Sequence, residues 1–396
     1  VTFQRKAKGA KFDPYNYKHY ITYDLVKARY QSTFPEVILP ERNIRILPTY
    51  SEASIYLSEI LSAKLPVSTD IEVLNEQVTH ISFAKTAFDA MSIAFLAKGD
   101  NFYAPDEEAN LWLLISDILE SLEVEKILQN RNYDSSVLLR RYGIKIRNAQ
   151  DTMIAAGVLM PDFHKGLDFT TSVYTNQPYY KEEGKQHIKY GTTEDNFCIY
   201  NGLDSCVLHE IWPQQKEDLL LQKNWQTYVN QNAVVDVLLY MEERGNKIDV
   251  PGIKKAKVEM EEEIAKIRAK IDQLCGKDFN HRSVKQLKHL LYDVRRWPEV
   301  KLRGKVSTAA KALKKLAQKG CEEASLILKL RKLEKLTGTY LSAAFDEDGR
   351  FRCNYNAVGT RQGRLSSSKN NFGTGTNLQN IPPVVKKLFI SDYFPE

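Results

Sequence analysis

The sequence predicts an α/β domain with a mixed sheet flanked by helices, followed by a largely helical region and a return to short strands. Three observations predict this order. Residues 65–74 alternate apolar and polar side chains with the period of a strand. Residues 108–122 carry apolar side chains at helical spacing. Between residues 230 and 341, stretches with helical spacing follow one another closely.

The composition is that of an ordinary globular protein. The chain has 396 residues, of which 43% are hydrophobic and 27% charged, and this length allows two or three domains. No run of about 18 apolar residues is present, so we expect no membrane-spanning helix and no membrane partner. The first residues lack the apolar core of a signal peptide, and the five cysteines form no CxxC pair. We therefore expect a cytoplasmic protein.

Charge is distributed unevenly along the chain. The net charge is +6, but residues 281–340 contain sixteen Lys and Arg against five Asp and Glu, a local balance of +11. A basic segment joined to a more acidic one is typical of a polyanion-binding surface beside a metal site. A solvated lysine-rich helix face produces the same pattern, so charge alone leaves both interpretations open.

The first half of the chain begins with a basic, tyrosine-rich stretch, residues 1–45, which either contacts nucleic acid or packs as an extension. The mixed pattern that follows predicts strands at 67–74, 80–84, 90–96 and 126–130 and helices at 53–63, 108–122 and 135–142. The last of these helices is expected to end at Gly143. Residues 173–195 are polar, charged and rich in tyrosine, which predicts a long loop.

The second half is predicted to be helical at first. Expected helices cover 230–244, 252–274 and 321–341, and another ends at Gly320. We expect Ser307 or Thr308 to cap the start of that last helix, because hydroxyl side chains bond to the first backbone N–H groups. Short strands and a glycine-rich loop occupy the final fifty or so residues.

Two carboxylates stand side by side on the first strong strand. Asp70 and Glu72 are two residues apart, so they project from the same face. Adjacent carboxylates repel each other unless a cation or a shared proton relieves them. Their hard oxygen ligands suit Mg²⁺ or Mn²⁺. An edge strand with two solvated acids is the alternative interpretation of this pair alone.

Two further acids complete a possible site. Asp134 lies near a strand-to-helix turn that contains Asn130, and Tyr200 and Asp204 are four residues apart, on one face if the segment is helical. Each observation is ambiguous alone, because an Asp at a helix start is usually a cap. A Tyr and an Asp at this spacing are usually half-buried packing.

The order of these residues resembles that of the DEDDy 3′→5′ exonucleases. A strand DxE is followed by an Asp at a helix start about sixty residues on, and by YxxxD about seventy residues beyond. The resemblance implies an RNase H-like (DnaQ-type) fold in which Tyr200 positions the attacking water. It also implies that two divalent metal ions, Mg²⁺ or Mn²⁺, are held by four acids: Asp70, Glu72, Asp134 and Asp204. All four are present, as in the active members of that family.

The C-terminal region resembles a second signature. Residues 359–368 (GTRQGRLSSS) and 377–382 (NLQNIP) are similar to the TxTGRLSSxxPNLQNIP motif of family A DNA polymerases, the bacterial DNA polymerase I group. Upstream elements keep the family order, and the matches run from about Lys64 to Phe389. An insert at 369–376 and the stretch 179–185 resemble phage-type members. If the protein is phage-encoded, its expected location is the host cytoplasm.

The two resemblances together imply four parts. These are an N-terminal extension (1–45), a 3′→5′ exonuclease domain (46–215), a helical thumb (216–345) and the start of an incomplete palm (346–396). Arginine and short amides suit contacts with DNA backbone and groove edges. The residues implied to contact DNA are Asn130, Ser307, Thr308, Lys335, Thr360, Arg361, Arg364, Asn377, Gln379 and Asn380.

The expected function is that of a family A DNA polymerase with a proofreading exonuclease, acting in DNA replication. Its expected partners are primer–template DNA, a single-stranded 3′ end, the rest of the palm and fingers on this or a separate polypeptide, and a processivity factor where one is used. We expect the polymerase metal and nucleotide-binding motifs to lie outside these residues. Two alternatives stay open: a free-standing exonuclease of RNase D type, and a non-catalytic DNA-binding subunit completed by a separate polymerase polypeptide.

Overall fold

The computed structural model describes residues 14–36, 39–97, 99–182, 193–302 and 304–392. The chain divides into two compact units, one of Val1–Glu243 with Tyr355–Ser366 and the other of Arg244–Asn354 with Ser367–Glu396. Residues 216–243 therefore belong to the first unit. The sequence-based boundaries, which remain predictions, group them with the helices that follow.

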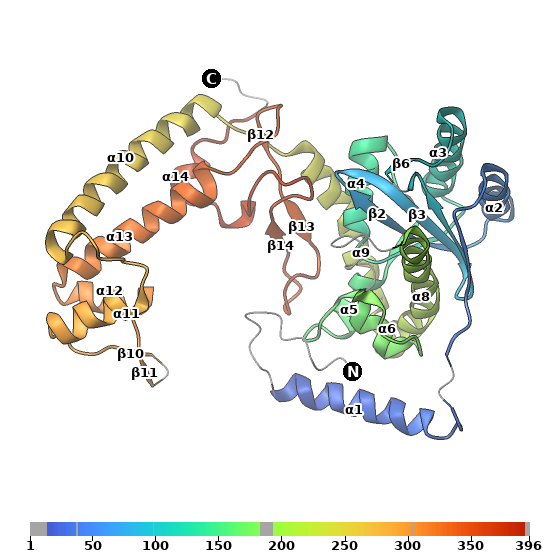
Figure 1. Ribbon diagram of the computed structural model, residues 1–396, viewed down its shortest axis with the longest axis horizontal. Helices are drawn as coiled ribbons and strands as arrows, with labels where there is room; N and C mark the ends of the chain where they lie inside the picture. Colours follow the sequence, from blue (N-terminus) through green and yellow to red (C-terminus); the bar gives the residue numbers. More distant parts are fainter. Residues whose placement is uncertain (1–13, 37–38, 98, 183–192, 303, 393–396) are drawn as a thin grey trace. The chain divides into compact units, whose positions relative to one another are not determined.

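The first unit is built on a six-stranded mixed sheet in the order β1-β4-β3-β2-β7-β8 (Figure 1). Strand β3 runs antiparallel to β2 and β4, whereas the pairs β1–β4, β2–β7 and β7–β8 are parallel. The strands are β1 (Asn43–Ile46), β2 (Val67–Leu74), β3 (Gln77–Thr86), β4 (Asp89–Ala94), β7 (Lys126–Leu128) and β8 (Ala149–Asp151). The predicted α/β fold with a mixed sheet is confirmed.

Helices cover both faces of this sheet (Figure 1). Helix α8 (Glu194–Leu221) crosses one face, where α5 (Thr152–Leu159) and α6 (Leu167–Tyr174) pack against it. Helices α2 (Tyr50–Ala63) and α3 (Pro105–Glu120) pack together on the other face. Alternation along the strands separates the two faces, so odd-numbered apolar residues such as Ile81 and Phe83 are buried away from α8.

Small side chains let α8 lie close to the sheet. The Ser68 hydroxyl donates a hydrogen bond of 2.6 Å to the backbone oxygen of Ser205, and the hydroxyls of Ser82 and Ser205 are 2.7 Å apart. Gly202 faces β1 so closely that a Cβ atom there would lie 2.4 Å from Cγ2 of Ile44. This close packing sets the distance between the sheet and the helix that carries Tyr200 and Asp204.

The N-terminal stretch contains helix α1 (Pro14–Gln31), which packs within the first unit. The Tyr20 ring contacts Phe163 and Phe169 edge-on, with centroid distances of 5.3 and 5.5 Å. The Lys27 ammonium donates a 2.9 Å hydrogen bond to the backbone oxygen of Ser172. The described part of residues 1–45 therefore packs as an extension, and its contact with nucleic acid stays a prediction. Residues 1–13 and 37–38 lie outside the described residues.

The remaining elements of the first unit connect these layers. They are β5 (Leu96–Ala97), β6 (Asp100–Asn101), α4 (Arg131–Tyr142) and α9 (Trp225–Arg244). Helix α4 ends as expected at Gly143, which adopts φ 72°, a left-handed conformation that glycine accepts without strain. Strand β4 ends at Ala94, two residues earlier than predicted, and Leu96 begins β5 instead.

The second unit is mainly helical and has two apolar cores. One lies among α10, α12 and α13, and the other joins the start of α10 to the end of α13 and the C-terminal segment. Its helices are α10 (Val250–Cys275), α11 (Val284–Lys288), η2 (His289–Val294), α12 (Ala310–Gln318), α13 (Glu322–Leu336), η3 (Thr337–Leu341), η4 (Leu378–Asn380) and α14 (Pro383–Lys386). Its short strands are β9 (Asn246–Lys247), β10 (Lys301–Leu302), β11 (Lys305–Val306) and β12 (Arg350–Phe351), while β13 (Asn354–Asn356) and β14 (Ser366–Ser368) span the chain positions where the units divide.

Two further local predictions need correction. The N-cap of α12 is Ala309, so neither Ser307 nor Thr308 caps this helix; the Ser307 hydroxyl instead accepts the Ala309 N–H at 3.2 Å, just before the helix begins. The predicted loop 173–195 is shorter, because α6 extends to Tyr174 and α8 begins at Glu194; residues 183–192 of it lie outside the described residues. Among the described helices, none has the length and apolarity needed to cross a bilayer.

Candidate active site

Three carboxylates from two elements meet beside the sheet. Asp70 and Glu72 project from β2, Asp204 comes from α8, and one oxygen of each lies within 4.8 Å of the others. The strand alternation places both β2 acids on the face that α8 covers, and the close packing of α8 brings Asp204 to them. Carboxylate oxygens at this spacing can share a divalent cation.

The electrostatics of this group favour a bound cation. Burial, reinforced by the charge of Asp204, raises the pKa of Asp70 to about 7. Burial and then the charges of Asp70 and Asp204 raise the pKa of Glu72 well above its ordinary value. Because the charged forms repel one another, a cation placed among them would lower both pKa values. The residues present therefore fit a divalent metal ion.

Asp134 lies close to this group but outside the set of three. It occupies the first turn of α4 with 4% of its surface exposed. Burial and then the charge of Asp70 raise the pKa of Asp134 well above its ordinary value. The turn before it is made by Asn130, whose φ of 61° is left-handed and whose side chain makes no capping bond to α4.

A buried acid absent from the sequence-based set holds that turn in place. Asp151, at the end of β8, accepts the backbone N–H groups of Asn130 and Arg131 at 3.0 and 2.9 Å. The same carboxylate caps α5 by accepting the N–H groups of Met153 and Ile154 at 2.8 and 3.2 Å. Asp151 thus fixes the position of α4 and its Asp134. An Asp directly before an apolar helical run is a recognisable capping signal, although the contact with residues 130–131 is not visible in the sequence.

Tyr200 and Asp204 share one face of α8, as predicted, but they are joined there by two residues from the segment predicted to be a loop. The Tyr180 hydroxyl donates a 2.5 Å hydrogen bond to Asp204, and the Lys181 ammonium forms an ion pair with the same carboxylate. Lys181 also lies 3.2 Å from the Tyr200 hydroxyl and 4.8 Å from its ring centroid. Burial and then Asp204 raise the pKa of Tyr200, so this hydroxyl stays protonated near neutral pH.

Asn201 is a further residue that sequence reasoning missed. Its side-chain amide donates to Oδ2 of Asp70 at 3.3 Å and to the Asp70 backbone oxygen at 3.2 Å. Its own oxygen accepts the Ser92 hydroxyl at 2.9 Å. Asn201 therefore orients the Asp70 carboxylate from α8. Its position directly after Tyr200 was the only signal in the sequence.

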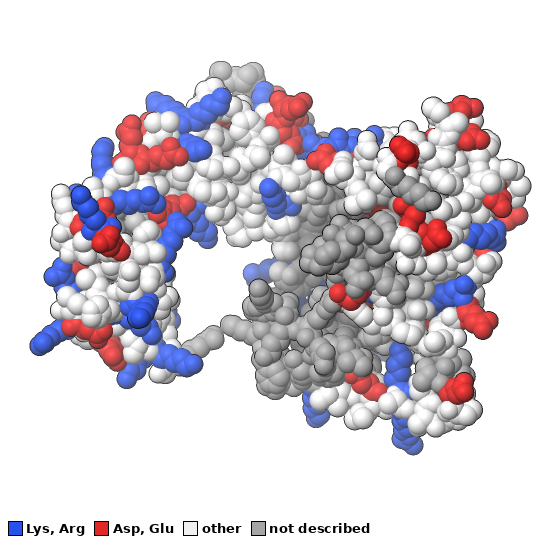
Figure 2. Space-filling model, viewed as in Figure 1, with Lys and Arg blue, Asp and Glu red and all other residues white. Residues whose placement is uncertain are grey.

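The second unit contains a pocket of ≈ 650 Å³ that brings together three of the residues implied to contact DNA. Ser307, Thr308 and Lys335 line it with Arg282, Lys288 and Arg331. Figure 2 shows that Lys and Arg side chains are frequent on the surface of this helical part, with acidic side chains among them. A pocket with several cationic donors suits an anionic ligand such as a phosphate.

Glu334, an acid of the pocket lining, is hydrogen-bonded to basic side chains beside it. Partial burial would raise the pKa of Glu334, but hydrogen bonds from Arg268, Arg282 and His281 lower it to about 2. The Arg268 and Arg282 bonds measure 2.6 and 2.8 Å. Glu334 thus orders Arg282, which lines the pocket, and Arg268, which lies outside the lining.

The other residues implied to contact DNA fall into both units. Thr360, Arg361 and Arg364 belong to the first unit, where the Thr360 hydroxyl bonds with the Arg364 backbone and Arg361 is 3.2 Å from Asp162. The NLQNIP segment belongs to the second unit.

In that segment Asn377 accepts the Ser367 hydroxyl and the Asn380 N–H, at 2.8 and 3.2 Å. The Gln379 N–H donates to the Ser367 hydroxyl at 3.3 Å. Asn377 therefore has a structural role in forming η4, in addition to any contact with a ligand.

Two family models match consecutive parts of the chain. The family described as 3′-5′ exonuclease matches residues 44–219, and the family described as DNA polymerase family A matches residues 251–392. The first match contains all four predicted acids and Tyr200. The second contains the pocket and the NLQNIP segment.

Curated relatives agree with both matches. DNA polymerase I of Helicobacter pylori is 29% identical over 344 residues, covering 82% of this chain and 36% of that protein. DNA polymerase I of Caldicellulosiruptor bescii is 27% identical over 85% of this chain and 39% of its own length. The thermostable DNA polymerase I of Thermus aquaticus is 36% identical over 63% of this chain and 28% of its own length.

The chain matches only part of each relative, and its fold is similar to that of a solved polymerase domain. This chain spans about a third of the length of the curated relatives it matches. Among solved structures, the POL domain of Pol1 from M. smegmatis in complex with DNA primer-template and dNTP has a TM-score of 0.69 at 20% identity. That likeness covers 89% of this chain and 60% of the other, and it shows a shared fold.

Proposed function

This chain belongs to the family A DNA polymerases, and we propose that its first unit is the proofreading 3′→5′ exonuclease of a replicative enzyme. The reaction is hydrolysis of the last phosphodiester bond at a DNA 3′ end. The observation that carries the proposal is the convergence of Asp70, Glu72 and Asp204 within 4.8 Å, inside the segment that matches the exonuclease family. An isolated pair of solvated acids on an edge strand would not lie half-buried beside a buried carboxylate of α8.

We propose that the acids hold two divalent ions, Mg²⁺ or Mn²⁺. Asp70, Glu72 and Asp204 supply oxygens directly, and Asp134 completes the set from the start of α4. When bound, the ions supply activation of a water molecule and stabilisation of the leaving 3′ oxygen. The raised pKa values of Asp70, Glu72 and Asp134 support this assignment, because buried and half-buried carboxylates at close range require compensating positive charge.

The other residues of the site position the reacting groups. The Tyr200 hydroxyl, kept protonated by burial, is placed to orient the water that attacks the phosphorus. Asn201 holds Asp70 by its amide, and Asp151 holds the turn before Asp134. Lys181 supplies positive charge next to Asp204.

The second unit is proposed to grip DNA. The pocket lined by Ser307, Thr308 and Lys335 offers hydroxyl and ammonium donors for a phosphate. Thr360, Arg361, Arg364, Asn377, Gln379 and Asn380 are proposed to follow the primer–template strand, as in the family motif they match. Polymerisation itself, with the remaining palm and fingers as partners, is proposed for the whole protein.

The test is a nuclease assay on the purified chain. With Mg²⁺, it should shorten 5′-labelled single-stranded DNA from the 3′ end and should act more slowly on a fully paired end, since an unpaired end costs less to unstack. The double variant Asp70→Ala, Glu72→Ala should lose at least about 100-fold in rate, since both proposed metal-binding acids of β2 are then absent. Undiminished activity in this variant would overturn the assignment, and a preference for structured RNA over DNA would favour an RNase D-type enzyme instead.

A further inference from the structure

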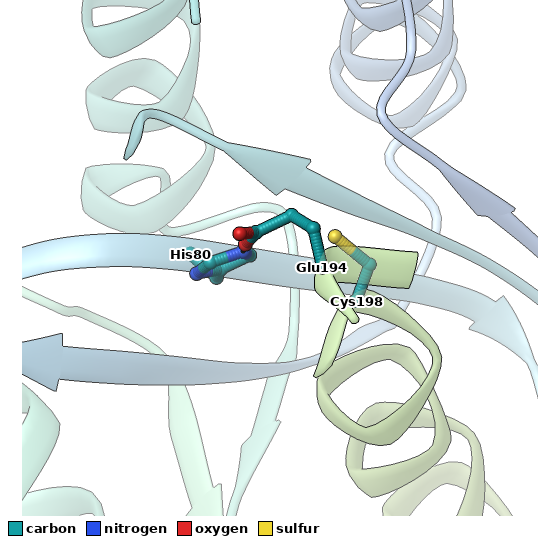
Figure 3. Close-up of side chains that lie close together, drawn as sticks. All are labelled: His80, Glu194 and Cys198. Carbon is teal, nitrogen blue, oxygen red and sulfur yellow. The ribbon is translucent and has the colours of Figure 1, made fainter. Parts of the chain in front are cut away.

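A second group of metal-ligating side chains lies beside the acids. His80 reaches from β3, and Glu194 and Cys198 come from the first two turns of α8 (Figure 3). One ligand atom of each, a nitrogen, an oxygen and a sulfur, lies within 4.8 Å of the others. Glu194 and Cys198 are four residues apart on a helix, so they share the face that meets the sheet.

The group is enclosed and ordered. The side chains of His80 and Glu194 are 2% and 11% exposed, and Cys198 is completely buried. His80 Nε2 lies 2.8 Å from a Glu194 oxygen, while Nδ1 lies 3.0 Å from the Thr79 hydroxyl. A hydrogen bond at the second ring nitrogen is the usual way in which a metal-binding histidine is oriented. The ring is also held edge-on by Phe197, with centroids 4.8 Å apart.

The donor set differs in chemistry from the acid cluster. A thiolate with an imidazole and a carboxylate favours zinc, whereas the all-oxygen set of Asp70, Glu72 and Asp204 favours magnesium or manganese. A tetrahedral zinc ion with bonds of about 2.0–2.3 Å holds its ligands roughly 3.5 Å apart. Because the three ligand atoms already lie within 4.8 Å of one another, side-chain movements of about 1 Å would bring them to this spacing.

We propose that His80, Glu194 and Cys198 form a zinc site, with a water molecule as the fourth ligand. The site is separate from the proposed catalytic ions and shares no ligand with them. It goes beyond the proposed exonuclease activity, because it would bind zinc whether or not the chain degrades DNA.

The position of the group gives it a structural role. In the antiparallel register of β2 and β3, His80 is the direct partner of Glu72, and Cys198 precedes Tyr200 by two residues. An ion bound here would connect β3 to the start of α8. It would therefore fix the end of the helix from which Tyr200 and Asp204 project.

The alternative is a buried His–Glu ion pair with a cysteine that only fills space. Both arrangements have the same contacts between the three side chains, but only the zinc site would bind a thiophilic metal ion through the Cys198 sulfur. Cobalt(II) is a suitable probe, because it occupies zinc sites and a bound thiolate gives it a near-ultraviolet charge-transfer band.

The experiment uses the full chain, stripped with chelator and dialysed into excess Mg²⁺ to occupy all-oxygen sites. One equivalent of Co²⁺ should produce the thiolate band, and Zn²⁺ should remove it. Cys198→Ser should abolish the band and weaken Zn²⁺ binding at least about tenfold. Cys206→Ser is the matched control, since Cys206 is an equally buried cysteine of α8 outside the group, and it should leave band and affinity unchanged.

Two further variants make the result decisive. Asp70→Asn combined with Glu72→Gln should retain the thiolate band, which separates this site from the acid cluster and from the fate of the proposed nuclease. If circular dichroism shows that Cys198→Ser is unfolded, His80→Gln is measured instead, and it should weaken Zn²⁺ binding while circular dichroism shows a folded protein. Absence of a thiolate band in the unmodified chain, or unchanged Zn²⁺ affinity in the folded ligand variant, would overturn the proposal.

Discussion

The ammonium group of Lys181 forms an ion pair with the Asp204 carboxylate, inside the cluster of acids that is proposed to bind metal. The two side chains are 14% and 4% exposed, so this is a largely buried contact. Lys181 thereby places a positive charge where a divalent ion is expected. The lysine and the metal should compete for the same carboxylate.

Replacing Lys181 with methionine is predicted to tighten binding of Mn²⁺ to the DNA-free chain by about threefold to tenfold. The reason is that a largely buried ion pair, which competes with the metal for the Asp204 carboxylate, is removed. Electron paramagnetic resonance of free Mn²⁺ during a titration measures this directly. Lys216→Met is the control, because the Lys216 ammonium lies 5.7 Å from the Trp225 ring centroid and takes no part in the acid cluster. Weaker Mn²⁺ binding in Lys181→Met would show that the lysine assists the metal.

The metal-free chain is predicted to lose stability as the pH rises from about 4 to about 7. The folded-state pKa of Asp70 is about 7, above the ~3.9 of an unfolded chain. In this interval the folded state binds more protons than the unfolded state, so the free energy of unfolding falls with rising pH. Below the unfolded pKa both states are protonated and the penalty is absent.

The Asp70→Asn variant isolates that effect. At pH 8 in chelator it should be more stable than the parent chain by roughly 1–3 kcal/mol, since each pKa unit is worth ~1.4 kcal/mol and the neighbouring acids share the repulsion. At pH 4 the two should unfold at the same urea concentration. Asp117→Asn, at an exposed position of α3, should show no such pH-dependent difference. A parent chain that gains stability between pH 4 and 7 would contradict the prediction.

Replacing Asp151 with alanine is predicted to lower the free energy of unfolding by about 2–4 kcal/mol, because a helix cap is lost and buried N–H groups are left without an acceptor. It should also weaken Mn²⁺ binding, since the turn that places Asp134 loses its anchor. Urea unfolding and the Mn²⁺ titration measure the two effects.

Asp249→Ala provides the comparison for Asp151. Asp249 caps α10 through a single 2.9 Å bond to the Gly252 N–H and belongs to the other unit. It should cost only about 1 kcal/mol and leave Mn²⁺ affinity unchanged. Equal Mn²⁺ affinities in the two variants would remove the link between Asp151 and the acids.

Replacing Lys335 with alanine is predicted to weaken binding of primer–template DNA equally for all sequences. Because a phosphate contact releases counterions, the slope of log affinity against log salt should fall in magnitude by about 1. Fluorescence anisotropy at several salt concentrations measures it. Lys319→Ala is the control and should change the slope less, because Lys319 is an exposed lysine directly after α12 and outside the pocket lining. A sequence-dependent loss would point to base contact instead.

What the sequence could predict was local or already contained in a family pattern. Alternation placed Asp70 and Glu72 on one strand, and the four-residue spacing placed Tyr200 and Asp204 on one helix face. The family order then predicted their convergence. The family A match over residues 251–392 also argues against the free-standing exonuclease. Phage-type origin remains a prediction.

What could not be predicted depends on contacts between distant segments. Lys181 and Asp204 are 23 residues apart, and nothing in a polar, tyrosine-rich stretch identifies the residue that reaches an acid. Asp151 was not singled out from the sequence, because its hydrogen bonds to the turn at residues 130–131 join segments that lie apart in the chain. The cap expected from Ser307 or Thr308 was wrong because the helix begins two residues beyond the nearer hydroxyl, at Ala310.

The close packing of α8 on the sheet limits which amino-acid substitutions this protein can accept. The distance between Asp204 and the strand acids depends on residues with no chemical role. Gly202 has no side chain and so leaves room for Ile44, and the serines at 68, 82 and 205 form hydrogen bonds between helix and sheet. One added methyl group at position 202 would lift the helix and separate the acids. At these four positions side-chain volume, rather than charge or reactivity, sets the tolerance of the site to mutation.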